Sequence, residues 1–131
     1  MRLLIDTNVL ISSFVFDGRP LNLLYTLFAK GYALYVSEYI DAEFREKVAQ
    51  KWKSRERKIL DEYERLGIPM LKSTENVYRV LRDADDDPIL SDAIDHDIDI
   101  ILSGDKDFLD AGLEHPKVMS VSMLYELLSE D

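Results

Sequence analysis

Four acidic residues stand at positions where α/β proteins commonly carry chemistry. Asp6 and Asp105 each follow a short apolar run that is typical of a buried strand. Asp86 stands at the start of an expected helix, of which Asp86 or Asp87 is the predicted N-cap, and Glu43 lies in a helix expected after another strand. Because the carboxyl ends of parallel strands meet at one edge of a sheet, these four acids are predicted to converge on one cleft.

Such a cluster of carboxylates indicates a bound cation, since the charges otherwise repel and some of the groups stay protonated. With oxygen ligands alone, the expected ion is Mg²⁺ or Mn²⁺. Thr7, Asn8 and Ser103 add hydroxyl and amide groups that could orient ligands or water. A metal held at an open sheet edge suits phosphoryl transfer, in which the ion activates water and stabilises the leaving oxygen.

Two of these acids also have simpler interpretations. Asp6 or Thr7 could merely cap the helix that follows, because both residue types are good N-caps. Glu43 lies beside the apolar face of its helix and could pair with Lys47, one turn further on. Spacing alone leaves these alternatives open.

The elements that must position the acids follow from apolar periodicity and from capping residues. Ser37, Ser54 and Ser122 are predicted N-caps, and Gly67 is predicted to end a helix. Alternating strands and helices predict right-handed crossovers and a parallel sheet in an α/β fold. No state is assigned to residues 77–81, and residues 103–117 are expected to form a loop. Strands are predicted at 2–5, 32–36, 68–71, 99–102 and 118–121, and helices at 8–15, 21–29, 38–52, 55–66, 88–96 and from 122 to near 129.

Composition bounds the class of protein. The 131 residues predict one domain, 1–131, and 47% hydrophobic with 32% charged residues is ordinary for a soluble globular chain. The absence of cysteine excludes disulfides, thiolate zinc sites and a cysteine nucleophile. No apolar run is long enough to span a membrane, and no signal peptide pattern opens the chain, so a cytoplasmic location is expected.

The formal net charge is −10, but the charges are unevenly distributed. Aspartates crowd residues 83–110, whereas Lys and Arg dominate residues 45–58. An acidic cluster beside a basic stretch indicates a cation site next to a track for a polyanion, although two solvated helix faces would give the same pattern. The predicted RNA-binding residues are Lys47, Lys51, Lys53, Arg55 and Arg57.

The ordered motifs resemble those of PIN-domain nucleases, most of all the toxins of prokaryotic toxin–antitoxin pairs. The resemblance implies a three-layer α/β/α sandwich around a central parallel sheet, and an Mg²⁺- or Mn²⁺-dependent ribonuclease. By motif position, Asp6, Glu43, Asp86 and Asp105 would bind the metal, with Asp107 auxiliary. The family often has Asn after the third acid, where Asp87 stands here, so Asp86 and Asp87 could exchange roles. The matching segments are Leu4 to Val9, Ser37 to Phe44, Asp83 to Asp86, and Leu102 to Leu109.

The main hypothesis is therefore hydrolysis of RNA by metal-activated water, in a protein that partners an antitoxin and forms a homo-oligomer. One alternative is a catalytically weak binding module that acts through a partner protein, with the apolar helices at 21–29 and 55–66 as its interfaces. A second is a phosphatase of the haloacid dehalogenase type, with Asp6 as nucleophile. That family's pattern has a second Asp at the position where Asn8 stands, which argues against this alternative.

Overall fold

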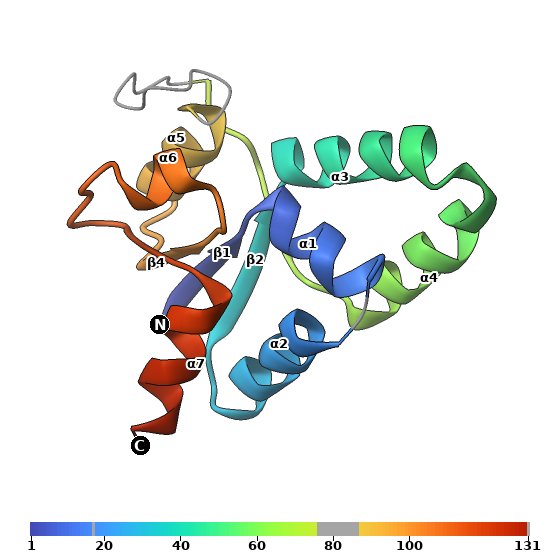
Figure 1. The fold of residues 1–131 in the computed structure, drawn as a ribbon. Coiled ribbons are helices and arrows are strands. Elements are labelled where there is room, and N and C mark those ends of the chain that lie inside the picture. The colour runs from blue at the N-terminus through green and yellow to red at the C-terminus, as the bar shows by residue number, and fades with distance from the viewer. Residues whose placement is uncertain (17, 76–86, 131) are drawn as a thin grey trace.

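A single parallel sheet forms the centre of the protein. The computed structural model describes residues 1–16, 18–75 and 87–130 (Figure 1). Its five strands lie in the order β3-β2-β1-β4-β5, and every neighbouring pair is parallel. The first strand in the sequence is therefore the middle strand of the sheet. The strands are β1 (Arg2–Ile5), β2 (Ala33–Ser37), β3 (Met70–Leu71), β4 (Ile100–Leu102) and β5 (Lys117–Met119).

Helices flank this sheet, which confirms the predicted α/β fold with a central parallel sheet. Figure 1 shows α5 and α6 on one side of β1 and β2, and α1 to α4 on the other. None of the helices in the described ranges is long and apolar enough to cross a membrane. The helices are α1 (Thr7–Phe14), α2 (Arg19–Ala29), α3 (Glu38–Lys51), α4 (Glu56–Leu66), α5 (Asp87–Asp95), α6 (Lys106–Leu109) and α7 (Val121–Ser129), with a 3₁₀ turn, η1 (Lys53–Arg55), before α4.

The middle strand is apolar on both of its faces because helices cover both sides of the sheet. Leu3, Leu4 and Ile5 are fully buried. In the register of the sheet, Leu4 lies opposite Tyr35 of β2 and Ile101 of β4. The burial of this strand fixes where its carboxyl end, and hence Asp6, must lie.

Two of the predicted helix ends are confirmed. The Ser37 side chain accepts a hydrogen bond from the Ile40 N–H at 3.1 Å and caps α3. Gly67 ends α4 in the left-handed conformation, at φ 67°. A side chain is strained in that conformation, which explains why glycine stands there.

Three sequence predictions differ from the structure. Ser54 does not cap α4, because it lies within η1 and α4 starts from Arg55 without a side-chain cap. Ser120, not Ser122, caps α7 by accepting from the Met123 N–H, since β5 already ends at Met119. The expected loop after β4 contains the one-turn helix α6, which is too short to show helical periodicity.

An aromatic cluster fixes α3 against α1 and α4. Phe14 of α1, Phe44 of α3 and Tyr63 of α4 have ring centroids 4.8–6.3 Å apart. The Tyr63 hydroxyl donates to Asp41 Oδ1 at 2.8 Å, so the one polar atom of this cluster is satisfied. The cluster seats the helix that carries Glu43.

We predict that Phe44→Ala lowers the free energy of unfolding by about 3–5 kcal/mol, because it leaves a cavity under α3. Urea unfolding followed by circular dichroism measures the change. Tyr25→Ala is the control, since Tyr25 is 54% exposed and should change stability by no more than about 0.5 kcal/mol. Equal effects of the two substitutions would contradict the role given to the cluster.

Candidate active site

The Asp6 carboxylate is held rigidly where β1 meets β4. Asp6 is 3% exposed, and its backbone N–H donates to the Leu102 carbonyl at 3.0 Å. Its Oδ1 accepts from the Thr7 N–H at 2.7 Å, and its Oδ2 accepts from the Ser103 hydroxyl at 2.7 Å. Asp6 does cap α1, as the simpler interpretation proposed. Capping, however, uses only one of its two oxygens.

The pKa of Asp6 is raised above its ordinary value of 3.8. Burial is the largest cause, and the hydrogen bonds from Ser103 and Thr7 oppose it without cancelling it. Repulsion from the carboxylates of Glu43 and Asp105 raises the pKa further. Two of the predicted acids, from two other segments of the chain, therefore act electrostatically on Asp6 at the carboxyl edge of the sheet.

Asp105 is joined to Asp6 through Ser103. The Ser103 hydroxyl donates to Asp6 and accepts from the Asp105 N–H at 3.0 Å. Asp105 in turn caps α6 by accepting from the Asp107 N–H at 2.9 Å. The Ser103 hydroxyl thus links the Asp6 and Asp105 segments. An orienting role of Ser103 toward ligands or water and a ligand role for the Asp107 carboxylate stay predictions.

Glu43 lies half-buried on α3, one residue from the fully buried Phe44. In the described ranges of the chain, both ion pairs belong to Arg45, which contacts Asp41 and Glu64. The alternative pairing of Glu43 with Lys47 is therefore not found. The electrostatic neighbour of Glu43 is the Asp6 carboxylate.

The Thr7 side chain has a feature that could not be predicted from the sequence. Its Oγ1 is the one buried side-chain oxygen or nitrogen, among the described residues, that lacks a hydrogen-bond partner. A buried hydroxyl without a partner is costly. Because Thr7 directly follows Asp6, the unpaired hydroxyl fits a site completed by water or by a bound ion. Asn8 is exposed and lines a surface groove with Gly104 and Ser120.

The donors fit a hard divalent cation but do not enclose one. Within residues 1–16, 18–75 and 87–130, no three acidic or histidine side chains lie close enough to hold a metal ion together. Asp86 lies outside the described residues, as does the side chain of Asp87 at the start of α5. Carboxylate and hydroxyl oxygens are the ligands that Mg²⁺ and Mn²⁺ prefer.

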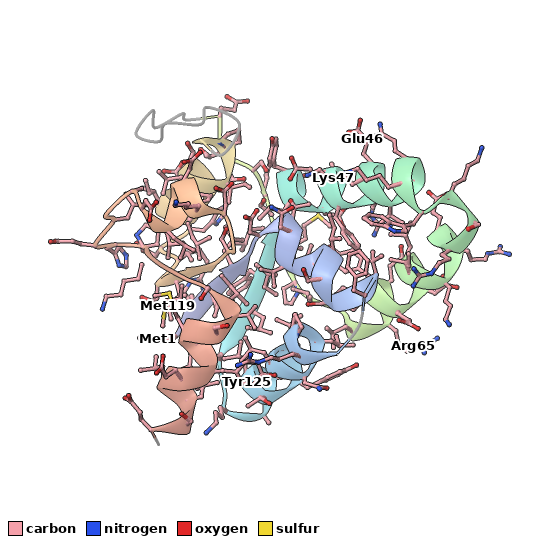
Figure 2. All side chains as sticks on the ribbon, in the orientation of Figure 1. Met1, Glu46, Lys47, Arg65, Met119 and Tyr125 are labelled. Carbon is pink, nitrogen blue, oxygen red and sulfur yellow. The ribbon has the colours of Figure 1, made fainter. Side chains whose placement is uncertain are left out.

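The predicted RNA-binding residues begin beside the acids and extend away from them. Lys47 lies one helical turn after Glu43 on α3, and Lys51 follows a turn later, each turn advancing about 5.4 Å. Figure 2 labels Lys47 beside Glu46 on α3, where Lys47 is half-buried and Glu46 is exposed. The Arg55 guanidinium donates to the Val15 carbonyl at 2.8 Å, so this residue also joins η1 to the end of α1. Lys53 lies in η1 and Arg57 in α4, and both are exposed.

Sequence reasoning missed one buried acid, Asp92 of α5, which is 1% exposed. It accepts hydrogen bonds from Ser73 and Thr74, which follow β3. The only sequence feature that could have indicated the burial of Asp92 was its position beside the apolar stripe of the helix, one residue before Ala93. Because many aspartates surround Asp92 in the sequence, this position did not distinguish it from acids on the surface.

Comparison with known proteins identifies the family. The model of the PIN domain matches residues 2–107, so the chain belongs to the PIN domain family. Members of this family are typically nucleases and generally bind divalent metal ions. No curated protein matches the sequence.

Two solved structures share the fold. The chain is 20% identical to a chain in the crystal structure of VapBC2 from Rickettsia felis bound to a DNA fragment from the promoter, with a TM-score of 0.72 over 92% of this chain and 98% of that one. It is 22% identical to a chain in the structure of FitAB bound to an IR36 DNA fragment, with a TM-score of 0.64 over 91% and 94% of the two chains.

The raised pKa of Asp6 predicts a stability that depends on pH. The folded chain retains a proton that the unfolded chain releases near pH 3.8. As pH rises from 3.8 through the folded pKa, this group therefore removes stability. We expect Asp6→Asn, in the absence of divalent ions, to gain stability relative to the wild type over this window.

Urea unfolding of both proteins at a series of pH values, in the presence of a chelator, tests this expectation. Asp110→Asn removes an exposed carboxylate near the same loop and controls for the change in net charge. A difference between wild type and Asp6→Asn that stays constant with pH would show that the pKa of Asp6 is the same in the folded and the unfolded chain.

Proposed function

We propose that this protein is a metal-dependent ribonuclease that hydrolyses RNA phosphodiester bonds. One observation carries the proposal: the buried Asp6 carboxylate lies within electrostatic range of Glu43 and Asp105. Repulsion among these acids weakens when a divalent cation binds between them. Membership of the PIN domain family supports the same activity, because its members are typically nucleases.

Asp6, Glu43 and Asp105 would hold the cation, together with Asp86 or Asp87 and with Asp107 as an auxiliary ligand. The ion, Mg²⁺ or Mn²⁺, would lower the pKa of a bound water and neutralise charge on the scissile phosphate. Ser103 and the Thr7 N–H fix the direction of the Asp6 oxygens. The Thr7 hydroxyl, which has no hydrogen-bond partner, and the exposed Asn8 amide would orient water near this carboxylate.

We predict that Asp6→Asn and Asp105→Asn each abolish Mn²⁺ binding and lower RNA cleavage by at least about 100-fold, since even the loss of groups that support metal ligands costs about 10–100-fold. Calorimetric titration of Mn²⁺ and cleavage of a labelled RNA give the two measurements.

Asp110→Asn is the matched control, because it removes an exposed charge next to α6 and should leave both measurements unchanged. Circular dichroism shows whether the variants are folded. Cleavage at the wild-type rate by both site variants would contradict the assignment of Asp6 and Asp105 as metal ligands. Metal binding by the wild type without cleavage of any RNA would favour the alternative of a weakly active binding module.

We further propose that the substrate strand follows α3 away from the acids. Lys47 and Lys51 lie on successive turns of α3 beyond Glu43, each turn advancing about 5.4 Å along the helix axis. Lys53, Arg55 and Arg57 would continue this track. The positive charge of the track supplies the attraction for phosphates that the net charge of −10 would otherwise oppose.

Reversing Lys47 and Lys51 to Glu should weaken RNA binding and reduce the salt dependence of the dissociation constant by about 0.7 in log–log slope for each lost phosphate contact. Fluorescence anisotropy in EDTA measures binding without cleavage. The double variant Lys30→Glu and Lys117→Glu makes the same charge change just before β2 and at the start of β5, away from the acids. Equal losses in the two double variants would show only a general electrostatic effect.

The comparisons also support a partner protein. Both matched structures are of toxin–antitoxin complexes, so we propose that this chain is a toxin that binds an antitoxin and forms a homo-oligomer. A surface groove of about 440 Å³ between α1, α2 and α4 provides a candidate site for the partner. It is lined by Phe14, Leu21, Tyr25, Glu62, Arg65 and Leu66.

A further inference from the structure

An exposed aromatic pair lies where the end of α1 meets the end of α3. The Phe16 and Trp52 rings have centroids 5.8 Å apart at an interplanar angle of 88°, which is an edge-to-face contact. Trp52 is half-buried and packs against the hydrophobic core, whereas Phe16 is 66% exposed. Trp52 therefore anchors the pair, and Phe16 leaves most of its ring in water.

The backbone around both rings is held in place by hydrogen bonds. The Trp52 N–H donates to the Val48 carbonyl at 2.9 Å at the end of α3, and the Trp52 carbonyl accepts from the Arg55 N–H at 2.9 Å. The Arg55 guanidinium donates to the carbonyl of Val15, the residue before Phe16, at 2.8 Å. This link between η1 and the end of α1 fixes Phe16 beside Trp52, so the pair is formed without any ligand.

Cationic residues flank the aromatic pair. Residues 51–58 hold five Lys or Arg side chains and one acid, Glu56, in a chain whose net charge is −10. All five cationic residues are exposed. Asp17 follows Phe16 in the sequence, so the segments that carry the two rings hold five positive charges against two negative ones. The five cationic residues are Lys51, Lys53, Arg55, Arg57 and Lys58.

This combination fits a base of a single-stranded nucleic acid better than an apolar segment of a protein. Every base has a π face that stacks on an aromatic side chain, while a positively charged groove follows the phosphates on either side of it. The cores of protein–protein interfaces, by contrast, are depleted in Lys. An exposed ring with Lys and Arg on its flanks therefore favours a polyanion that also carries flat, stackable groups.

We propose that Phe16 and Trp52 form a base-stacking platform for single-stranded RNA, at the end of α3 that is remote from the acids. Trp52 lies nine residues after Glu43, which places the platform about 14 Å from that acid along the helix axis. A strand whose phosphates contact the flanking cations would stack one base on the exposed ring of Phe16. This inference rests on the proposed function, because it takes RNA as the ligand, but its test needs no metal ion.

The test uses Trp52, the single tryptophan of the chain, as its reporter. A short single-stranded RNA is titrated into the wild type in EDTA, which prevents metal-dependent cleavage. Stacking at the pair is expected to quench Trp52 fluorescence, with the same dissociation constant that the anisotropy of a labelled strand gives. A strand of the same length made of abasic nucleotides carries the same phosphates without bases, and it should bind more weakly and without quenching.

Substitutions at Phe16 separate stacking from charge. Phe16→Ala is expected to weaken RNA binding by about 5-fold, the lower end of the range for one stack of a base on an aromatic ring. The salt dependence of binding should not change, because no phosphate contact is lost. Phe16→Tyr keeps the ring and should bind RNA as the wild type does. Phe28→Ala is the matched control, since Phe28 is also exposed but lies in α2, and it should leave the affinity unchanged.

Circular dichroism shows whether each variant is folded, as expected for substitutions at exposed side chains. RNA binding without a change in Trp52 fluorescence, equal quenching by the abasic strand, or unchanged affinity in Phe16→Ala would overturn the inference and leave the proposed function intact. A wild type that binds neither strand would refute the proposed function as well.

Discussion

The buried carboxylate of Asp6 is the constraint on which the rest of the site depends. Its two oxygens face donors from different segments, the Thr7 N–H and the Ser103 hydroxyl, across the junction of β1 and β4. Those bonds favour the ionised form, yet burial and two neighbouring carboxylates outweigh them and raise the pKa of Asp6. The surroundings of Asp6 therefore disfavour its ionised form, and a positive charge at this edge of the sheet would favour it.

The order of the strands explains how acids far apart in the sequence reach one place. β1 lies in the middle of the sheet, with β2 on one side and β4 on the other. The segments that leave these three strands carry Asp6, Glu43 and Asp105. Adjacent parallel strands lie about 4.8 Å apart, so the topology alone brings the acids to the same edge. The side chains of Ser103 and Ser37 then fix the local direction of the chain at that edge.

Much of this arrangement could be predicted because it depends on local chemistry. The apolar run before Asp6, the cap at Ser37 and the stop at Gly67 each specify a boundary within a few residues. Helix α6 was not predicted because a single helical turn is too short to show a repeat of apolar residues. The true cap of α7, Ser120, was missed because the pairing of β5 with β4, a contact distant in sequence, decides where that strand ends. The missing partner of the Thr7 hydroxyl and the hydrogen bond from Ser73 to Asp92 depend on tertiary contacts that no sequence pattern marks.

The aspartates show most clearly why charge patterns alone could not separate chemistry from structure. Residues 83–110 include Asp105, which repels Asp6, and Asp92, whose carboxylate joins two segments of the fold. In sequence both are acids in an acidic stretch, and only their partners distinguish them. Asp92 has donors for both oxygens and is structurally satisfied, whereas Asp6 has donors for both and still faces two further negative charges. An acid that remains electrostatically unsatisfied after its hydrogen bonds are made is the one that points to a ligand.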